Sequence, residues 1–461
     1  MATSTPAEAT FLEWFKAAGG TVHPAVQLKE DCEGMGRGAI AGEDIEADTL
    51  LFSIPRTILL TTATASLQSL LPPDAWSSLG GWTPLILSMM REYLRTSTWA
   101  PYFALLPTGF DALMHWSPDE LDELKGSNVL SKVGRDEADE EYEDTVKAFV
   151  KEHEDVFGNA DEYTAELFHR MGSLVLSRSF HVDSKDEDED KEDSDDEDED
   201  DEEEREDVAD VAMVPFADIL NAKSGSDNAR LFYEPTTLNM MSTQRIPAGA
   251  QIFNTYADPP NSDLLRRYGH VDEVNDADLV EVGLETVVDL VGAAAGLSEE
   301  EREARAEWLL EVGVDDTYAI EMDHKLPDEL VMAIRTFLLD EADYAKAQKK
   351  ESPPKPKLDA ASAEWARKIL DHRLSEYSTS IEDDEAALEQ VDSAVLPLRK
   401  RMALIVRVGE KRILRAARAK LDAEYPAGAA TAQKKEKKRA RDGEAAGGKA
   451  SSSGKKTKVR Q

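Results

Sequence analysis

The alternation of apolar and polar positions divides the chain into parts with different secondary structure. Between residues 22 and 60, short apolar runs such as Leu50-Leu51-Phe52-Ser53-Ile54 alternate with glycine-containing turns, which predicts strands. From about residue 62 to residue 180 the apolar positions take helical spacing, and Ser117-Pro118-Asp119-Glu120 carries the capping box of a helix start. A strand-like stretch follows at 208–215. We therefore predict an α+β fold whose β-rich core is split by a helical insertion.

Beyond Tyr268-Gly269 the pattern is helical to about residue 425. Ser298 and Glu301 form a second capping box, which predicts a helix over 299–312. A further helix is amphipathic, because apolar residues recur at helical spacing from Leu330 onward. The proline-rich stretch at 352–356 indicates an extended linker. The pattern thus predicts an all-helical C-terminal domain over 270–425 and a disordered tail over 426–461.

Charge is unevenly distributed along the chain, which has 461 residues and a formal net charge of −41. Of the 22 residues at 186–207, 19 are acidic, and this density of like charge predicts a disordered acidic loop over 184–207. The segment 434–461 is basic instead, with 11 basic and 3 acidic residues. An acidic body disfavours direct binding to nucleic acid and favours a basic protein as partner, because nucleic acids are bound by neutralising their phosphates.

Several classes of protein are disfavoured by what the sequence lacks. There is no N-terminal apolar leader and no run of eighteen apolar residues, so we expect neither secretion nor a membrane contact. The single cysteine, Cys32, excludes an internal disulfide framework and a thiolate zinc cluster. The eight histidines lack ligand spacing, so we expect no metal site.

Two motifs in 213–273 carry the candidate chemistry. The first, V-P-F-A-D-I-L-N at 214–221, places Asp218 and Asn221 among apolar residues. A buried carboxylate must be hydrogen-bonded, so Asp218 either holds a turn or belongs to a site. The second, F-N-T-Y at 253–256 and N-S-D-L-L-R-R-Y-G at 261–269, contains Tyr256 and Tyr268. The residues alone allow these tyrosines to be half-buried anchors of a strand and of a short helix that Asn261 caps and Gly269 ends.

A glycine-rich segment, E-G-M-G-R-G at 33–38, could cradle a phosphate. A dinucleotide-binding fold requires a helix directly after such a loop, whereas residues 39–54 alternate and turn like strands. The sequence therefore leaves two interpretations, a glycine-rich hairpin or a loop that touches another ligand.

Together these motifs resemble the SET-domain protein lysine methyltransferases, in the branch that contains the Rubisco methyltransferase and the SET-domain-containing protein six group. Within that branch the sequence resembles the fungal ribosomal lysine methyltransferases of type four, which share the Asn221-Ala222 form of the motif where most of the family has Asn-His. The resemblance implies a SET domain over 22–257 with a pseudoknot, a C-terminal domain that binds substrate, and S-adenosyl-L-methionine as the cofactor.

The resemblance also implies roles for individual residues. Tyr256 corresponds to the catalytic tyrosine. The cofactor-binding positions correspond to Glu33, Gly34, Met35, Arg178, Asn221 and Ala222, and the substrate-binding positions to Asp218, Tyr233 and Tyr268. A second arginine that relatives carry four residues after Arg178 is replaced by Val182, so any contact it makes is missing or replaced here.

The expected activity is S-adenosylmethionine-dependent protein-lysine N-methylation, with monomethylation of a 60S ribosomal protein implied by the fungal resemblance. A histone or transcription-factor lysine methyltransferase is the alternative among enzymes, and a non-catalytic SET-like binder of basic proteins is the alternative of another class. Two basic clusters, K-K-E-K-K-R at 434–439 and K-K-T-K at 455–458, predict recognition by the nuclear import machinery and hence a nuclear location.

Overall fold

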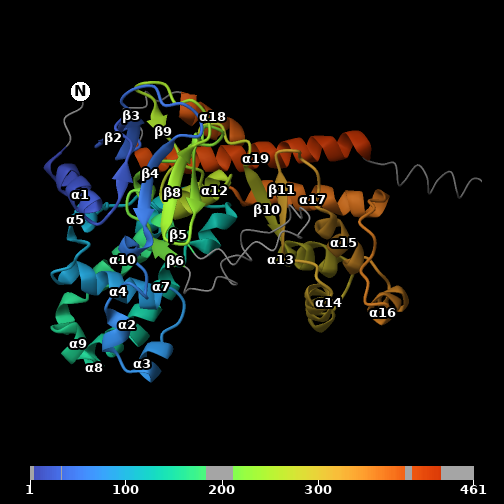
Figure 1. The fold of residues 1–461 in the computed structure, drawn as a ribbon. Coiled ribbons are helices and arrows are strands. Elements are labelled where there is room, and N and C mark those ends of the chain that lie inside the picture. Colours follow the sequence, from blue (N-terminus) through green and yellow to red (C-terminus); the bar gives the residue numbers. More distant parts are fainter. Residues whose placement is uncertain (1–4, 33, 183–210, 390–396, 427–461) are drawn as a thin grey trace, which may run out of the picture. The chain divides into compact units, whose positions relative to one another are not determined.

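The computed structural model describes residues 5–32, 34–182, 211–389 and 397–426 (Figure 1). The chain divides into two compact units, the first made of Met1–Leu121 and Val129–Asp276, the second of Asp122–Asn128 and Ala277–Gln461. The division falls at Asp276, and the predicted domain limits, 22–257 and 270–425, stay predictions. The acidic loop and the basic segment 434–461 lie outside the described residues. No helix of the described part is long and apolar enough to span a membrane.

Small antiparallel sheets form the β-rich part of the first unit. A four-stranded sheet has the order β1 (Thr21–Val22), β4 (Leu50–Pro55), β8 (Thr237–Ser242), β7 (Ala229–Tyr233). A three-stranded sheet joins β2 (Val26–Lys29), β3 (Gly38–Ala41) and β9 (Gln251–Ile252), and β5 (Ser179–His181) pairs with β6 (Val211–Met213). Because β4 and β3 pair with β8 and β9, strands from before the insertion are hydrogen-bonded to strands from after it. The predicted split of a β-rich core is therefore confirmed.

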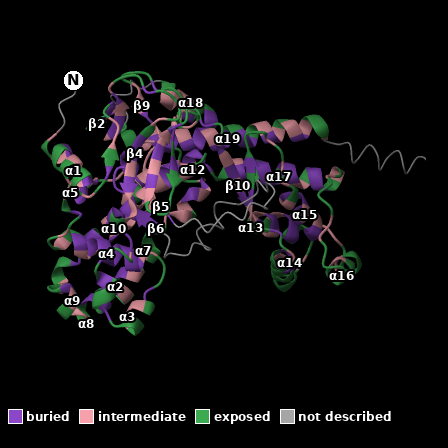
Figure 2. Ribbon diagram, viewed as in Figure 1, coloured by how far each residue is buried: buried purple, intermediate pink, exposed green. Residues whose placement is uncertain are grey.

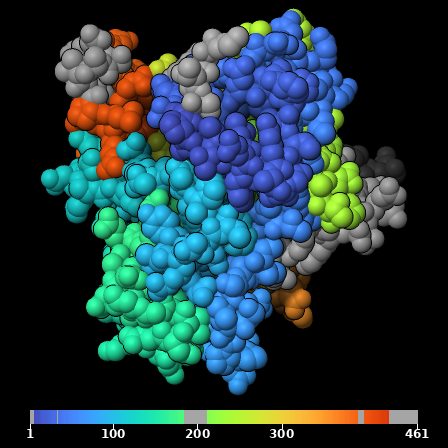
Figure 3. Space-filling view, turned by 60° about the vertical axis from the view of Figure 1, so that its left-hand side comes forward, coloured from blue at the N-terminus to red at the C-terminus, as the bar shows by residue number. Residues whose placement is uncertain are grey.

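The insertion itself is helical, as predicted. Its α-helices are α2 (Leu67–Leu70), α3 (Pro73–Ser77), α4 (Thr83–Leu94), α5 (Ala100–Phe103), α6 (Pro118–Leu121), α7 (Arg135–Glu141), α8 (Lys147–Glu152), α9 (Glu154–Phe157) and α10 (Ala165–Arg178). The predicted capping box at α6 is present, since the Glu120 side chain accepts from the Ser117 amide at 2.8 Å. Figure 3 shows the later part of the insertion, cyan to green, beside the blue part of the chain that precedes it. Figure 2 shows that α4 is largely buried and that α10 is buried along part of its surface.

An aromatic cluster fills the core of the first unit. Helix α1 (Pro6–Ala17) brings Phe11 and Phe15 to within 5.9 and 5.2 Å of the Phe216 ring centroid, and Phe52 of β4 lies at 4.4 Å. All four rings are fully buried. Phe216 has a φ of +84°, which is rare for a bulky residue. The cluster thus holds a strained backbone position two residues before Asp218.

The two motif segments of the first unit lie side by side. Asn221 and Phe253 form an isolated parallel bridge, and the Asn254 amide donates to the Asn221 carbonyl at 3.0 Å. The two segments therefore run side by side at this point, and the expected pseudoknot stays a prediction. The pairing brings 214–221 next to 253–256 although about thirty residues separate them in sequence.

The second unit is mainly helical. Its helices are α13 (Leu284–Val287), α14 (Glu299–Glu311), α15 (Asp328–Phe337), α16 (Glu341–Lys349), α17 (Ala360–Glu376), α18 (Ile381–Glu389) and α19 (Leu398–Glu424). Helix α14 starts with the capping box predicted at Ser298 and Glu301. The prediction of an all-helical domain over 270–425 needs one correction, because β10 (Leu279–Gly283) and β11 (Thr317–Glu321) form an antiparallel ladder. Alternate residues of both strands are buried against the helices, which makes the strand conformation favourable there.

A short segment of the insertion, Asp122–Asn128, belongs to the second unit. The Ser127 hydroxyl donates to Glu410 of α19 at 2.6 Å, and Arg373 of α17 donates to the Gly126 carbonyl at 3.0 Å. Tyr377 donates to the other Glu410 oxygen at 2.6 Å. Burial raises the pKa of the Glu410 carboxyl to about 7, and the two hydroxyl donors oppose that rise.

A buried ion cluster joins α18 to α19 in the same unit. Asp384 is paired with Arg407 at 2.8 Å and with Lys411 at 2.6 Å, and all three side chains are at most 3% exposed. Buried charges of one sign are tolerated only when their partners are present. Asp384 therefore compensates two cations at once.

We expect Asp384→Ala to lower the free energy of unfolding by about 3–5 kcal/mol, because it removes the buried carboxylate that two buried cations share. Urea unfolding of the full chain measures the change. Glu385→Ala is the matched control on the same helix, since Glu385 pairs with Arg412 in an exposed bridge that contributes at most about 1 kcal/mol. Equal losses in both variants would contradict the importance of the buried cluster.

Candidate active site

Asp218 is the most enclosed of the predicted site residues. It lies in a short 3-10 helix, Ala217–Ile219, and is 3% exposed. The Tyr102 hydroxyl of α5 donates to its Oδ2 at 2.6 Å, and the Arg178 guanidinium at the end of α10 donates to its backbone carbonyl. Two elements of the helical insertion thus hold the first motif in place.

The ionisation of Asp218 reflects opposing effects. Burial raises the pKa of its carboxyl to about 6, while the positive charge of Arg178 and the Tyr102 hydrogen bond hold it below the value that burial alone would give. The carboxyl is therefore mainly ionised at pH 7, and it accepts the Tyr102 proton donor as a charged group.

Tyr256 and Tyr268 come together in the structure. Their rings are stacked, with centroids 4.4 Å apart and an interplanar angle of 17°. The Tyr256 hydroxyl donates to the Leu220 carbonyl at 3.0 Å. Burial raises the pKa of Tyr256 to about 12. The phenol is therefore protonated at neutral pH in the folded chain, and its hydroxyl is held by the Leu220 carbonyl.

The expected cofactor residues gather around Asn221. Its side-chain amide donates to Gln251 Oε1 at 2.7 Å, and Gln251 Nε2 contacts the Met35 sulfur at 3.7 Å. Among the described residues, the Arg178 Nε is buried and has no hydrogen-bond partner. An unpaired guanidinium N–H is a group that a carboxylate ligand can satisfy. The arrangement fits the amino-acid end of S-adenosylmethionine, whereas Glu33 lies outside the described residues.

The glycine-rich segment forms a hairpin turn, not the start of a helix. The Cys32 amide donates to the Gly36 carbonyl at 2.8 Å, and the chain continues into strand β3. Gly34 has a φ of +87°, with open space around it. A side chain at Gly38 would lie 2.8 Å from the Asn221 amide nitrogen. A side chain at Gly38 would therefore displace the Asn221 amide. Because a strand and not a helix follows the loop, the dinucleotide-binding interpretation fails.

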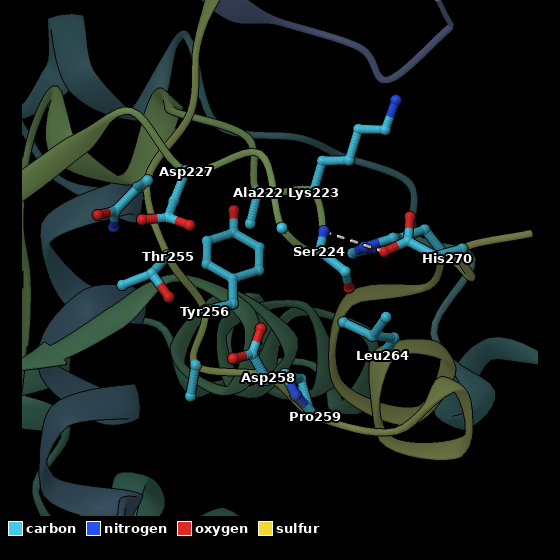
Figure 4. Close-up of a pocket in the computed structure, with 14 residues that line it drawn as sticks. Ala222, Lys223, Ser224, Asp227, Thr255, Tyr256, Asp258, Pro259, Leu264 and His270 are labelled. Carbon is cyan, nitrogen blue, oxygen red and sulfur yellow. Dashed lines mark hydrogen bonds between the residues drawn. The ribbon is translucent and has the colours of Figure 1, made fainter. Parts of the chain in front are cut away.

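A small pocket opens beside Tyr256 (Figure 4). In Figure 4 the Tyr256 ring stands amid the lining residues, and the Lys223 side chain extends away from it. The lining consists of Ala222, Lys223, Ser224, Gly225, Asp227, Asn254, Thr255, Tyr256, Ala257, Asp258, Pro259, Leu264, His270 and Asp272. Burial lowers the pKa of His270, so its imidazole is neutral at pH 7.

Some predicted residues lie elsewhere or act differently. Tyr233 ends β7, is 40% exposed and does not line the pocket, so its substrate role stays a prediction. The predicted cap by Asn261 is wrong, because Pro260 occupies the N-cap position. The Asn261 amide instead bonds the backbone of Asp272, at 3.0 and 2.8 Å. Gly269 ends the helical turn 264–268 with a φ of +73°, as predicted.

Comparison with known proteins identifies the family. The SET domain model matches residues 36–257, and the Rubisco LSMT substrate-binding model matches residues 297–414. The N-lysine methyltransferase SETD6 of Mus musculus is 30% identical over 440 residues, covering 88% of this chain and 89% of the relative. The chain belongs to the SET-domain protein-lysine methyltransferases.

Two further similarities place this methyltransferase within the family. The ribosomal lysine N-methyltransferase 4 of Saccharomyces cerevisiae is 33% identical over 290 residues, covering 60% of this chain and 58% of that relative. A crystal structure of the SET domain of LSMT bound to lysine and AdoHcy matches with a TM-score of 0.68 and 21% identity, covering 91% of this chain and 92% of that one. The SET fold and the helical C-terminal region are thus confirmed. The protein is a protein-lysine N-methyltransferase that uses S-adenosylmethionine.

The raised pKa of Asp218 predicts a pH-dependent stability. Between pH 4 and pH 6 the folded methyltransferase binds more protons than the unfolded chain, so the Asp218 contribution to the free energy of unfolding falls as pH rises. Asp218→Asn removes this titration. Relative to the unmodified chain, we expect the variant to gain about 2 kcal/mol between pH 4 and pH 7, measured by urea unfolding. A difference that does not change with pH would contradict the burial of an ionisable group here.

Proposed function

We propose that the methyltransferase monomethylates a lysine of a 60S ribosomal protein in the nucleus. The observation that carries the choice of substrate is the 33% identity to the yeast ribosomal lysine N-methyltransferase 4. The net charge of −41 supports a basic partner, because a strongly acidic enzyme attracts a basic protein over a distance. The Asn221-Ala222 pair lies at the centre of the site, beside Gln251 and the pocket.

Residues around the hairpin at 34–38 bind the cofactor in this proposal. We assign the Arg178 guanidinium to the cofactor carboxylate, because its Nε is buried and unpaired among the described residues. Asn221 and Ala222, with the backbone at Gly34 and Met35, hold the remainder. S-adenosylmethionine supplies, when bound, a methyl group activated by a positively charged sulfur.

Orientation of the substrate amine falls to the two tyrosines and nearby carbonyl groups. A lysine amine with its ordinary pKa of ~10.4 is protonated at pH 7, and transfer into a desolvated channel lowers that pKa. The Tyr256 hydroxyl donates to the Leu220 carbonyl, so two polar oxygen atoms lie side by side where the amine would be oriented. Tyr256, with a pKa of about 12, does not take the amine proton at neutral pH, so the proton leaves to solvent. The gain in rate is then mainly positional.

Replacing Tyr256 with Phe removes the hydroxyl and keeps the ring stacked on Tyr268. We expect kcat to fall about 100-fold, as for the loss of one oriented polar group beside the reacting centre, with cofactor affinity unchanged. Tyr163→Phe is the matched control, since the buried Tyr163 also donates to a backbone carbonyl, that of Phe157 at 3.2 Å. Single-turnover kinetics with labelled cofactor compares the rates of the two variants. A normal rate in Tyr256→Phe would show that the hydroxyl has no role in the reaction.

The substrate is tested with ribosomes from yeast that lacks ribosomal lysine N-methyltransferase 4, in parallel with a histone fraction. Labelled S-adenosylmethionine is added, and labelled bands are analysed by mass spectrometry. We expect one 60S protein to gain a single methyl group on one lysine. Label confined to histones would replace the ribosomal proposal with a histone methyltransferase, which the same acidic charge also permits. Tyr256→Phe serves as the low-activity control for labelling by the enzyme.

The nuclear location depends on the basic tail, which lies outside the described residues. A fluorescent fusion of the full chain should accumulate in the nucleus, and a fusion ending at Ala432 should not, because it lacks both basic clusters. Fluorescence microscopy compares the two. Equal nuclear accumulation would show that import depends on another signal or on a partner.

A further inference from the structure

The helical turn that carries Tyr268 rests directly on the backbone of the insertion. Gly269, which follows Tyr268, has a φ of +73°. A Cβ atom at Gly269 would lie 2.5 Å from the Ala112 backbone nitrogen and 2.6 Å from the Asp111 carbonyl carbon. Atoms of the main chain cannot move aside as the end of a side chain can, so this approach requires glycine for two independent reasons.

The backbone that meets Gly269 is itself held at several points. It belongs to residues 110–116, called the insertion loop below. The fully buried Trp116 donates its indole N–H to the Asp111 carbonyl at 2.7 Å, which closes the loop on itself. The His115 ring stacks on Phe110, with centroids 5.0 Å apart.

The insertion loop is also fixed to helix α10. His115 Nε2 lies 2.7 Å from the hydroxyl of Ser173, a buried residue of that helix. The same helix ends at Arg178, which donates to the Asp218 carbonyl. One helix thus supports the insertion loop through Ser173 and the first motif through Arg178.

We propose that the insertion loop positions Tyr268, and through the ring stack Tyr256, so that Gly269 and Trp116 act as positioning residues for methyl transfer. Contacts run from Trp116 to Asp111, from Asp111 to Gly269, and from Tyr268 to the Tyr256 ring at 4.4 Å. The proposal rests on the roles assigned above to Tyr256 and Tyr268. A shift of the Tyr268 ring changes the space beside the Tyr256 hydroxyl, and with it the number of methyl groups that the amine can accept.

Gly269→Ala tests the close approach, and Gly134→Ala is its matched control. Gly134 has a nearly equal φ of +68° at the start of α7, but no atom lies within 4 Å of the position of its Cβ. Both variants carry the same backbone strain, and only one collides with the insertion loop. We expect Gly269→Ala to lower kcat about 100-fold and to change the ratio of mono- to dimethylated product, with the KM for S-adenosylmethionine unchanged. Gly134→Ala should match the unmodified enzyme.

A second variant, Trp116→Phe, keeps one aromatic ring and removes the N–H that holds the Asp111 carbonyl, together with part of the buried indole. It should lower kcat and change the product ratio in the same direction as Gly269→Ala, by a smaller factor. Rates are divided by the folded fraction, taken from thermal unfolding at the assay temperature. This variant decides the matter if Gly269→Ala does not fold.

The assay uses labelled S-adenosylmethionine and whichever of the ribosomal and histone fractions the unmodified enzyme labels, so it does not depend on the substrate proposed above. A normal kcat and product ratio in Gly269→Ala and Trp116→Phe, with Tyr256→Phe impaired, would overturn the positioning role alone. Losses fully explained by the folded fraction would overturn it as well. A normal rate in Tyr256→Phe would instead overturn the assignment of the tyrosines.

Discussion

The active site depends on one backbone pairing between two segments of the chain, in which the amide of Asn254 donates to the carbonyl of Asn221 and Asn221 forms a parallel bridge with Phe253. The first segment carries Asp218 and the Leu220 carbonyl, and the second carries Tyr256, whose hydroxyl donates to that carbonyl. Neither segment contains a complete site. Because both are joined at the backbone, the geometry of the donor and its acceptor is fixed before any ligand binds, which is how a preorganised site lowers a barrier.

The helical insertion serves the site at three separate points. Tyr102 donates to the Asp218 carboxylate, Arg178 to the Asp218 carbonyl, and the insertion loop lies against Gly269. Each contact joins residues at least 40 positions apart in sequence. The insertion is therefore part of the catalytic core in physical terms, although it interrupts that core in the chain.

Signals that are local in sequence predicted their structures well. The capping boxes at Ser117 and Ser298 start helices, and Gly269 ends a turn, because each needs only residues within one turn of helix. Long-range pairing was not predictable in the same way. Strands β10 and β11 show an alternation of buried and more exposed residues over only five residues each. The two strands pair with one another, but helix α14 separates them in the sequence. Asparagine is a common helix-capping residue, but the side-chain amide of Asn261 donates to the Asp272 carbonyl instead.

The candidate site was predictable where a motif carried it and not elsewhere. Asp218, Asn221, Tyr256 and Tyr268 lie together as the resemblance implied, whereas Tyr233 lies apart from the pocket. No pattern in the sequence indicated Tyr102, which lies 116 residues before its partner Asp218. The pocket residues His270 and Asp272 had a weak signal, since they directly follow the second motif, but nothing in their spacing named a function.

Segment Asp122–Asn128 has a consequence for how such proteins can be divided and recombined. The chain leaves the first unit, contributes Ser127 and Gly126 to the buried hydrogen bonds of Glu410 and Arg373, and returns. A gene fragment ending at Asp276 would encode this segment without either partner, and one starting at Ala277 would encode the partners without the segment. The two units can therefore be inherited, exchanged or produced only as a pair, because each fragment alone leaves buried polar groups unpaired.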